Sequence, residues 1–251
     1  MTNVRQYSRP RELGEALRLL EQSGAVAVGG GTEVNSHDHD QPIAVVDLQE
    51  LGLDGIELRE PSALHIGATV TLQSLLEHAD VPVALRDAAR REVPSSLRSR
   101  ATVGGSVCGQ RLDSEVVAAL LMHEAVAVVL GLNGRVKISI ADLIKDRFPI
   151  EHRILTAVTI DPSGVTASER TGRTRADRPI VAVHGRRRAN GTCRIVITGV
   201  ADRPIVVDGE AGDVRGALIA TAGFGDFRGS REYRRALAEV LTGRVLGELG
   251  R

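Results

Sequence analysis

The chain has 251 residues, which is enough for one large domain or two modest ones with a substantial core. Its 32 basic and 32 acidic residues balance, so nothing favours a polyanionic partner such as nucleic acid. No apolar run approaches the roughly 20 residues of a membrane span, and the amino terminus lacks the apolar stretch of a signal peptide. Cys108 and Cys193 are too few for an iron–sulfur cluster or a cysteine-rich zinc site. We therefore expect a cytoplasmic protein with two reduced thiols.

The first part of the chain alternates between helix and strand patterns. Apolar residues at helical spacing predict a helix over residues 10–22, which Gly24 ends. Short apolar runs predict strands at residues 25–28, 43–48 and 63–70. Further helices are predicted at residues 71–78, with Thr71 as the cap, and at residues 82–92.

The second part begins with a helix predicted at residues 114–124, amphipathic because Val116, Ala119, Leu120 and His123 share one side. Strands follow at residues 125–131, 134–140 and 153–160. The turn-forming run at residues 161–164 is the best candidate for a domain boundary. Beyond it, residues 179–200 read as a hairpin about Asn190-Gly191, and a last helix is predicted from about residue 230 to 246.

Two glycine-rich loops each follow an extended segment. The first glycine loop (residues 28–34) contains Gly29-Gly30-Gly31-Thr32-Glu33, and the second glycine loop (residues 101–106) contains Thr102-Val103-Gly104-Gly105-Ser106. Glycines let successive backbone amides converge on an anion, and the hydroxyl groups add donors. Two such loops could hold a pyrophosphate from both sides.

Other interpretations of the glycines remain open. A dinucleotide fingerprint needs a third glycine where this chain has Val34, and a phosphate-binding Walker loop needs a Gly-Lys-Thr or Gly-Lys-Ser that the sequence lacks. For either loop taken alone, an ordinary tight turn is the better interpretation. The order of motifs around the pair favours a ligand site.

Five segments carry that order: "YSRPRELGEALRLLEQSGAVAVGGGTEVN", "LHIGATVTLQSLLEH", "SSLRSRATVGGSV", "AALLMHEAVAVV" and "FRGSREYRRALAEVLTGRVL". Together they span nearly the whole chain. With them, the chain resembles the FAD-binding (medium) subunits of molybdenum hydroxylases, such as the carbon monoxide dehydrogenase and xanthine dehydrogenase flavoproteins. The resemblance implies an α+β fold: a two-lobed, vanillyl-alcohol oxidase-like FAD-binding domain of the PCMH type at residues 1–161, then a small α+β domain at residues 162–251.

The resemblance also implies the residues that bind FAD. In the two glycine loops these are Val28, Gly29, Gly30, Gly31, Thr32, Glu33, Val34, Ala101, Thr102, Val103, Gly104, Gly105 and Ser106. The family's usual acidic FAD contact falls on Glu115, or on Asp113 if the segment shifts. Leu155 is implied to touch the flavin ring, and Arg170 to supply a basic contact. The chain departs from the family pattern at Ser99, at Ser106 and across residues 108–115.

By the same resemblance, the chain is an FAD-dependent oxidoreductase subunit of a molybdopterin dehydrogenase complex. Substrate would be oxidised at a molybdenum cofactor on a large subunit. Electrons would then pass through iron–sulfur clusters on a small subunit to FAD here, and on to NAD, oxygen or a quinone. A standalone flavoprotein oxidoreductase, or a scaffold subunit that has lost its flavin, remains an alternative.

Other polar clusters have simpler interpretations. His37 to Asp40 could ligate a metal, but a short exposed polar loop is the better expectation. Arg186-Arg187-Arg188 is typical of a solvated hairpin tip rather than of a nucleic-acid patch. Cys108 is expected to be a small buried side chain. No hydrolytic triad is evident, which fits a flavoprotein because the flavin carries the redox chemistry itself.

Overall fold

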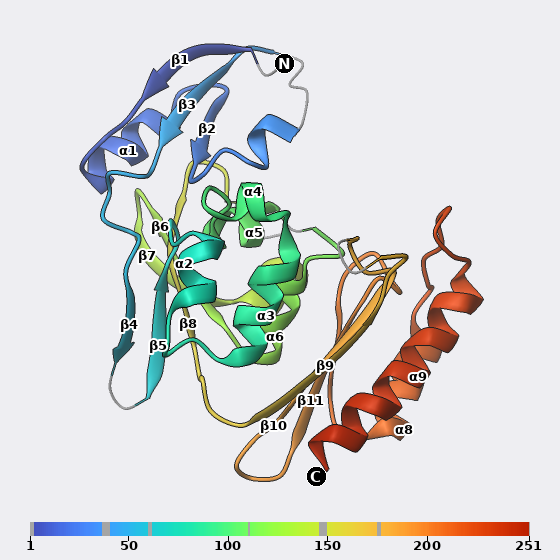
Figure 1. Ribbon diagram of the computed structural model, residues 1–251. Helices are drawn as coiled ribbons and strands as arrows, with labels where there is room; N and C mark the ends of the chain where they lie inside the picture. The colour runs from blue at the N-terminus through green and yellow to red at the C-terminus, as the bar shows by residue number, and fades with distance from the viewer. Residues whose placement is uncertain are drawn as a thin grey trace.

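The computed structural model describes residues 3–36, 41–59, 62–109, 111–145, 150–174 and 177–250. Three sheets follow one another along the chain, and the two termini lie at opposite ends of the molecule (Figure 1). None of the helices in these ranges combines the length and the apolar character that a membrane crossing needs.

The first sheet is parallel and has the order β1-β3-β2. Its strands are β1 (Val4–Ser8), β3 (Ile43–Asp47) and β2 (Ala25–Val28). All five residues of β3 are buried because this strand is central and the adjacent helix α1 (Leu13–Leu20) covers the sheet. The helix begins after Glu12, so the prediction that it starts at Pro10 was too early. Gly24 follows it with a φ of 70°, which suits glycine. A short 3₁₀ turn, η1 (Val34–Ser36), ends the first glycine loop.

The second sheet is antiparallel and has the order β4-β5-β8-β6-β7. Its strands are β4 (Ile56–Arg59), β5 (Ala63–Gly67), β8 (Ile154–Ile160), β6 (Val126–Gly131) and β7 (Gly134–Ser139). The helices that accompany it are α2 (Leu72–Glu77), α3 (Val83–Glu92), α4 (Ser95–Arg98), α5 (Val103–Gly109), α6 (Glu115–Met122) and α7 (Ile140–Lys145). Thr71 caps α2 by accepting from the amide of Ser74, as the sequence predicts.

The third sheet is antiparallel and has the order β12-β11-β10-β9. Its strands are β9 (Val165–Thr171), β10 (Val181–Arg187), β11 (Cys193–Thr198) and β12 (Ile205–Asp208). The predicted hairpin joins β10 to β11, and Gly191 in its turn has a φ of 85°. Helices α8 (Ala211–Ala220) and α9 (Arg231–Leu249) pack on this sheet, and α9 lies along β9 and β10 (Figure 1).

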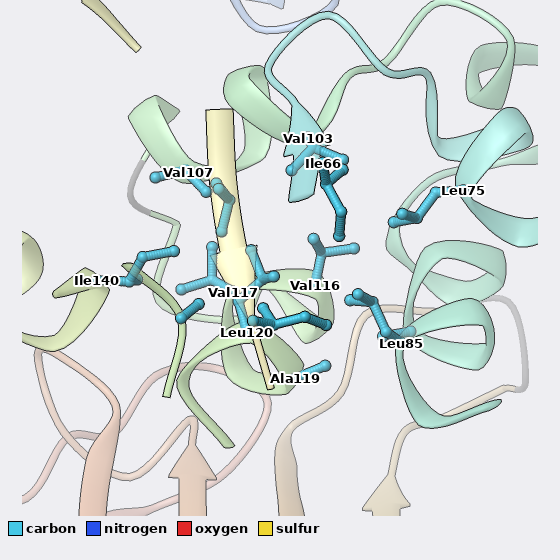
Figure 2. Close-up of a cluster of buried hydrophobic side chains, with 14 of the residues drawn as sticks. Ile66, Leu75, Leu85, Val103, Val107, Val116, Val117, Ala119, Leu120 and Ile140 are labelled. Carbon is cyan, nitrogen blue, oxygen red and sulfur yellow. The ribbon is translucent and has the colours of Figure 1, made fainter. Parts of the chain in front are cut away.

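Helix α6 lies at the centre of the largest core. The prediction that it is amphipathic was wrong, because all eight of its residues are buried. Val116, Val117 and Leu120 point into a cluster of apolar side chains from the helices and strands around them (Figure 2). Helix α3 packs on α6, and strands β10 and β11 of the third sheet also contact it. The helix therefore forms part of the core that joins the second and third sheets.

The arginines near the hairpin are not a solvated tip. The Arg186 side chain is fully buried, and it pairs with Glu124 at 3.2 Å and with Asp161. Its Nε also donates to the carbonyl oxygen of Ser163 at 2.8 Å. Arg186 thus ties β10 to the end of α6 and to the segment that connects the second and third sheets.

Candidate functional site

A cavity of about 300 Å³ lies where the two glycine loops meet, and we call it the glycine cavity. Nine predicted site residues line it: Val28, Gly29, Gly30, Gly31, Thr32, Glu33, Val34, Thr102 and Gly105. Four further residues were not predicted for the site: Val26, Ala27, Cys108 and Gly109. Cys108 is exposed in the structure, so the expectation that it is buried was wrong.

The glycines allow the two loops to touch. A Cβ atom on Gly30 would overlap the backbone carbonyl oxygen of Arg100. A Cβ atom on Gly29 would lie 2.7 Å from the hydroxyl of Thr102. Arg100 also joins the loops, because its Nε donates to the carbonyl oxygen of Gly30 at 3.4 Å. Part of the glycine pattern therefore serves the contact between the loops rather than the approach of a ligand.

The first glycine loop presents free amides to the cavity. In the described part of the chain, the backbone N–H groups of Gly30, Gly31 and Thr32 donate to no acceptor. Buried or partly buried amides without a partner are uncommon in native proteins, because each costs free energy. Three consecutive ones at a cavity wall form a cradle that suits an anion.

The second glycine loop has a different character. Sequence analysis predicts a loop with free amides, whereas residues from Val103 onward form helix α5. The amides of Val103 and Gly104 donate to the carbonyl oxygens of Val70 and Ala68, at 3.0 and 2.8 Å. The amide of Gly105 donates to the Thr102 hydroxyl at 3.1 Å. This side of the cavity therefore offers a hydroxyl group and a surface without side chains, rather than a second set of free amides.

Four of the remaining predicted residues lie inside the protein around the second loop. Ala101, Val103 and Ser106 are buried, and Gly104 packs so tightly that a Cβ atom would lie 2.7 Å from the carbonyl oxygen of Ala68. These residues shape the loop but do not line the glycine cavity.

The predicted acidic and basic contacts lie elsewhere. Asp113 pairs with Arg178 at 3.1 Å and with Arg111 at 3.6 Å, and it lines a separate cavity of about 410 Å³. Arg111 also approaches Glu33 at 3.9 Å, so it connects Asp113 to the rim of the glycine cavity. Leu155 is buried in β8, within the large core.

Glu115 is 1% exposed and holds two arginines from different parts of the chain. It pairs with Arg91 of α3 at 2.7 Å and with Arg170 of β9 at 3.2 Å. Burial raises the pKa of the Glu115 carboxyl, and the two guanidinium groups oppose that rise. The structure thus brings Glu115 and Arg170 together, but in a bridge between α6 and β9 and away from the glycine cavity.

The described residues hold no group of three or more histidine, cysteine or acidic side chains placed to bind a metal ion. The motif at His37 to Asp40 lies outside the described residues.

Residues 2–162 match the family described as the FAD binding domain in molybdopterin dehydrogenase. The chain belongs to this family. Its cofactor is FAD, as the sequence motifs indicate. The uncharacterized protein YgfM of Escherichia coli K12 is 31% identical over 250 residues, covering 95% of this chain and 93% of YgfM.

Solved structures show the same fold as this member of the FAD-binding family. Reconstituted CO dehydrogenase from Oligotropha carboxidovorans is similar at a TM-score of 0.88 with 22% identity. Quinoline 2-oxidoreductase from Pseudomonas putida 86 is similar at a TM-score of 0.85 with 20% identity. In both comparisons the match covers 99% of this chain and 98% of the other. They confirm the prediction of a two-domain α+β flavoprotein fold.

The glycine cavity fits the pyrophosphate of FAD. The free amides of the first loop can donate to phosphate oxygens, and the bare surface at Gly105 lets a phosphate approach α5. Thr102 places a hydroxyl group between the loops. The two loops contribute differently. The first loop supplies free amides, whereas the second supplies a hydroxyl group and a surface without side chains.

Proposed function

We propose that this chain is the FAD-binding electron-transfer subunit of a molybdenum-hydroxylase-type oxidoreductase. A large subunit with a molybdenum cofactor would oxidise the substrate, and a small subunit with iron–sulfur clusters would deliver electrons to this chain. The acceptor would be NAD, oxygen or a quinone. When bound, FAD supplies the capacity to take up and release one or two electrons.

The observation that carries this proposal is the row of free amides in the first loop of a chain from this FAD-binding family. Gly30, Gly31 and Thr32 would hold the pyrophosphate, and Gly105 and Thr102 would bound it from the other loop. The division of labour among subunits is consistent with a chain that has two cysteines, too few for a cluster of its own. The CO dehydrogenase and quinoline 2-oxidoreductase likenesses support an assembly of this kind.

Flavin content tests the site. Gly105 lies in helix α5 with no positive φ, and a Cβ atom there would meet only the Thr102 hydroxyl, at 3.1 Å. Gly105→Asp therefore keeps the backbone and places a negative charge in the glycine cavity. We expect purified wild-type protein, supplied with FAD, to retain it, and Gly105→Asp to lose at least about tenfold in FAD affinity. Absorbance at the flavin bands and FAD released on denaturation measure both.

Gly243→Asp is the matched control, because Gly243 is exposed on α9 and a Cβ atom there would meet no atom beyond its own helix. It should bind FAD like the wild type. Gly104→Asp would be a poor test, since Gly104 packs against the carbonyl oxygen of Ala68 and the variant would misfold locally.

Wild-type protein without flavin would contradict the proposal and favour a scaffold subunit. Copurification with molybdenum and iron–sulfur subunits from the native host would separate the complex from a standalone flavoprotein.

A further inference from the structure

Three successive carbonyl oxygens of the first glycine loop each accept one hydrogen bond. The donors are Nε2 of Gln49 to Gly29 at 3.0 Å, Nε of Arg100 to Gly30 at 3.4 Å, and the backbone amide of Asn35 to Gly31 at 3.1 Å. Among the described residues, none of these three donors belongs to the lining of the glycine cavity. The carbonyl groups of the loop are therefore held from outside the cavity.

Each of these bonds also fixes a free amide. A peptide unit is planar and trans, so its carbonyl group and the N–H of the following residue point in opposite directions. The three bonded carbonyl groups share their peptide units with the amides of Gly30, Gly31 and Thr32, which donate to no acceptor in the described part of the chain. Since the carbonyl groups are held from outside the cavity, the three N–H groups are directed towards it.

The loop needs such bonds because its own residues do not restrict it. Residues 29–31 are all glycine, and without a Cβ atom each has access to a wide range of φ and ψ. An unanchored loop would have to order its peptide units when a ligand binds. Bonds that order them beforehand lower the entropic cost of binding.

Gln49 is itself held in a defined orientation. Its Oε1 accepts from Arg9 at 3.2 Å, so its Nε2 is the atom that faces the Gly29 carbonyl group. Its backbone amide donates to Oδ1 of Asp47 at 2.9 Å, and the Asp47 side chain is buried at the end of β3. Because β3 is the central strand of the first sheet, Gln49 ties the glycine loop to a rigid element.

We infer that Gln49 and Arg100 are positioning residues for the pyrophosphate of FAD. They act through the loop, since each holds a peptide unit so that its N–H is presented to a phosphate oxygen before the cofactor binds. Asn35 makes the third bond with its backbone, so a change of its side chain does not remove that bond. The inference rests on the proposed function in that FAD occupies the glycine cavity.

Gln49→Met tests the first anchor, because it removes the Nε2 donor and keeps an uncharged side chain of similar length. We expect it to weaken FAD binding by the full chain about threefold to tenfold in isothermal titration calorimetry, as loss of one neutral hydrogen bond predicts. Gln6→Met is the matched control. Gln6 is exposed on β1, and its Nε2 donates to Oγ of Ser8 at 3.3 Å, outside the glycine cavity. This control should bind FAD like the wild type.

Arg100→Lys tests the second anchor and separates the hydrogen bond from the charge. Lysine places a methylene group where arginine has Nε, and it keeps the positive charge. We expect a loss of FAD affinity of about threefold to tenfold here as well. Arg18→Lys is the matched control, because Nε of Arg18 donates to the carbonyl oxygen of Gly14 at 3.2 Å, within α1 and outside the cavity.

Phosphorus NMR of bound FAD separates positioning from a general effect on the fold. At saturating FAD, the resonances of the bound pyrophosphate should move towards those of free FAD in Gln49→Met and Arg100→Lys, because amide donors turn away from the phosphates. They should not move in the two controls. A purely structural role would lower the urea midpoint of a variant and leave these resonances where they are in the wild type.

Three results would count against the inference. Equal FAD affinity in the wild type and both anchor variants would overturn it and leave the proposed function intact. Weakened binding with unchanged phosphorus resonances would also overturn it, because the amides would then keep their orientation without the anchors. Wild-type protein that binds no FAD would refute the proposed function, and this inference with it.

Discussion

At the scale of single residues, His184 has an unusual environment. It is 1% exposed on β10, and in the described part of the chain neither ring nitrogen has a hydrogen-bond partner. Burial lowers its pKa from 6.5 to about 3, so the folded protein holds it neutral. The unfolded chain takes up this proton below pH 6.5 and the folded chain does not. As the pH decreases below 6.5, the free energy of unfolding should therefore decrease as well. His184 contributes up to about 1.4 kcal/mol of this decrease per pH unit.

His184→Leu tests that contribution. No hydrogen bond is lost, and an apolar side chain of similar size fits a buried site. We expect the unfolding free energy, measured by urea denaturation from pH 7 to 4.5, to depend less steeply on pH than in the wild type. Some slope should persist from His123, whose pKa burial lowers to about 4. Parallel profiles for variant and wild type would show that His184 is not held neutral.

At the scale of elements, the two loops depend on their glycines for different reasons. Gly31 has a φ of 76°, so an alanine there costs about 1–2 kcal/mol of backbone strain. A methyl group on Gly30 would instead overlap a backbone oxygen of the facing loop, which no side-chain rotation relieves. We expect Gly30→Ala to lower the unfolding free energy by about 3 kcal/mol or more, and Gly31→Ala by clearly less. Urea denaturation of both variants measures the difference, and equal losses would mean that the loops do not touch as described.

Sequence patterns predict those strands, helices and turns whose conformation is decided by their own residues rather than by packing against distant segments. The apolar runs of β2, β3, β6 and β8 and the Asn190-Gly191 turn were all recognisable. Helix α5 was not, since its two internal glycines each disfavour a helix by about 1 kcal/mol relative to alanine. Packing against the carbonyl oxygens of Ala68 and Val70 decides its conformation instead. Strand β1 was missed because its residues are mostly exposed, and only its pairing with β3 makes it a strand.

The residues of the candidate site also fall into two groups, those whose place could be predicted from the sequence and those whose place could not. The first glycine loop could be predicted because its free amides follow directly from a strand that runs into glycines. The places of Glu115 and Arg170 could not, because their ion pair joins segments that are far apart in sequence and depends on how β9 packs. Contacts of this kind become visible only when the ion pairs are placed in three dimensions.

At the scale of the whole molecule, helix α6 makes the third sheet part of the main core. Val196 of β11 is fully buried in the same apolar cluster as α6. The bonds of Arg186 to Glu124 and Asp161 cross the same junction. The sequence-based division at residues 161 and 162, although close to the end of the family match, therefore separates two parts that share a core.

This shared core predicts that residues 1–162 are not stable alone. Without the third sheet, α6 would lose its cover on the side of β10 and β11. Each large apolar side chain that becomes exposed costs about 1.5–3 kcal/mol, and a few of them cancel much of a net stability of about 5–15 kcal/mol. We expect the 1–162 fragment to bind a hydrophobic dye and to unfold without a cooperative urea transition, and coexpression of residues 163–251 to restore both properties. A monomeric fragment that unfolds cooperatively and binds FAD would show instead that the two parts fold independently.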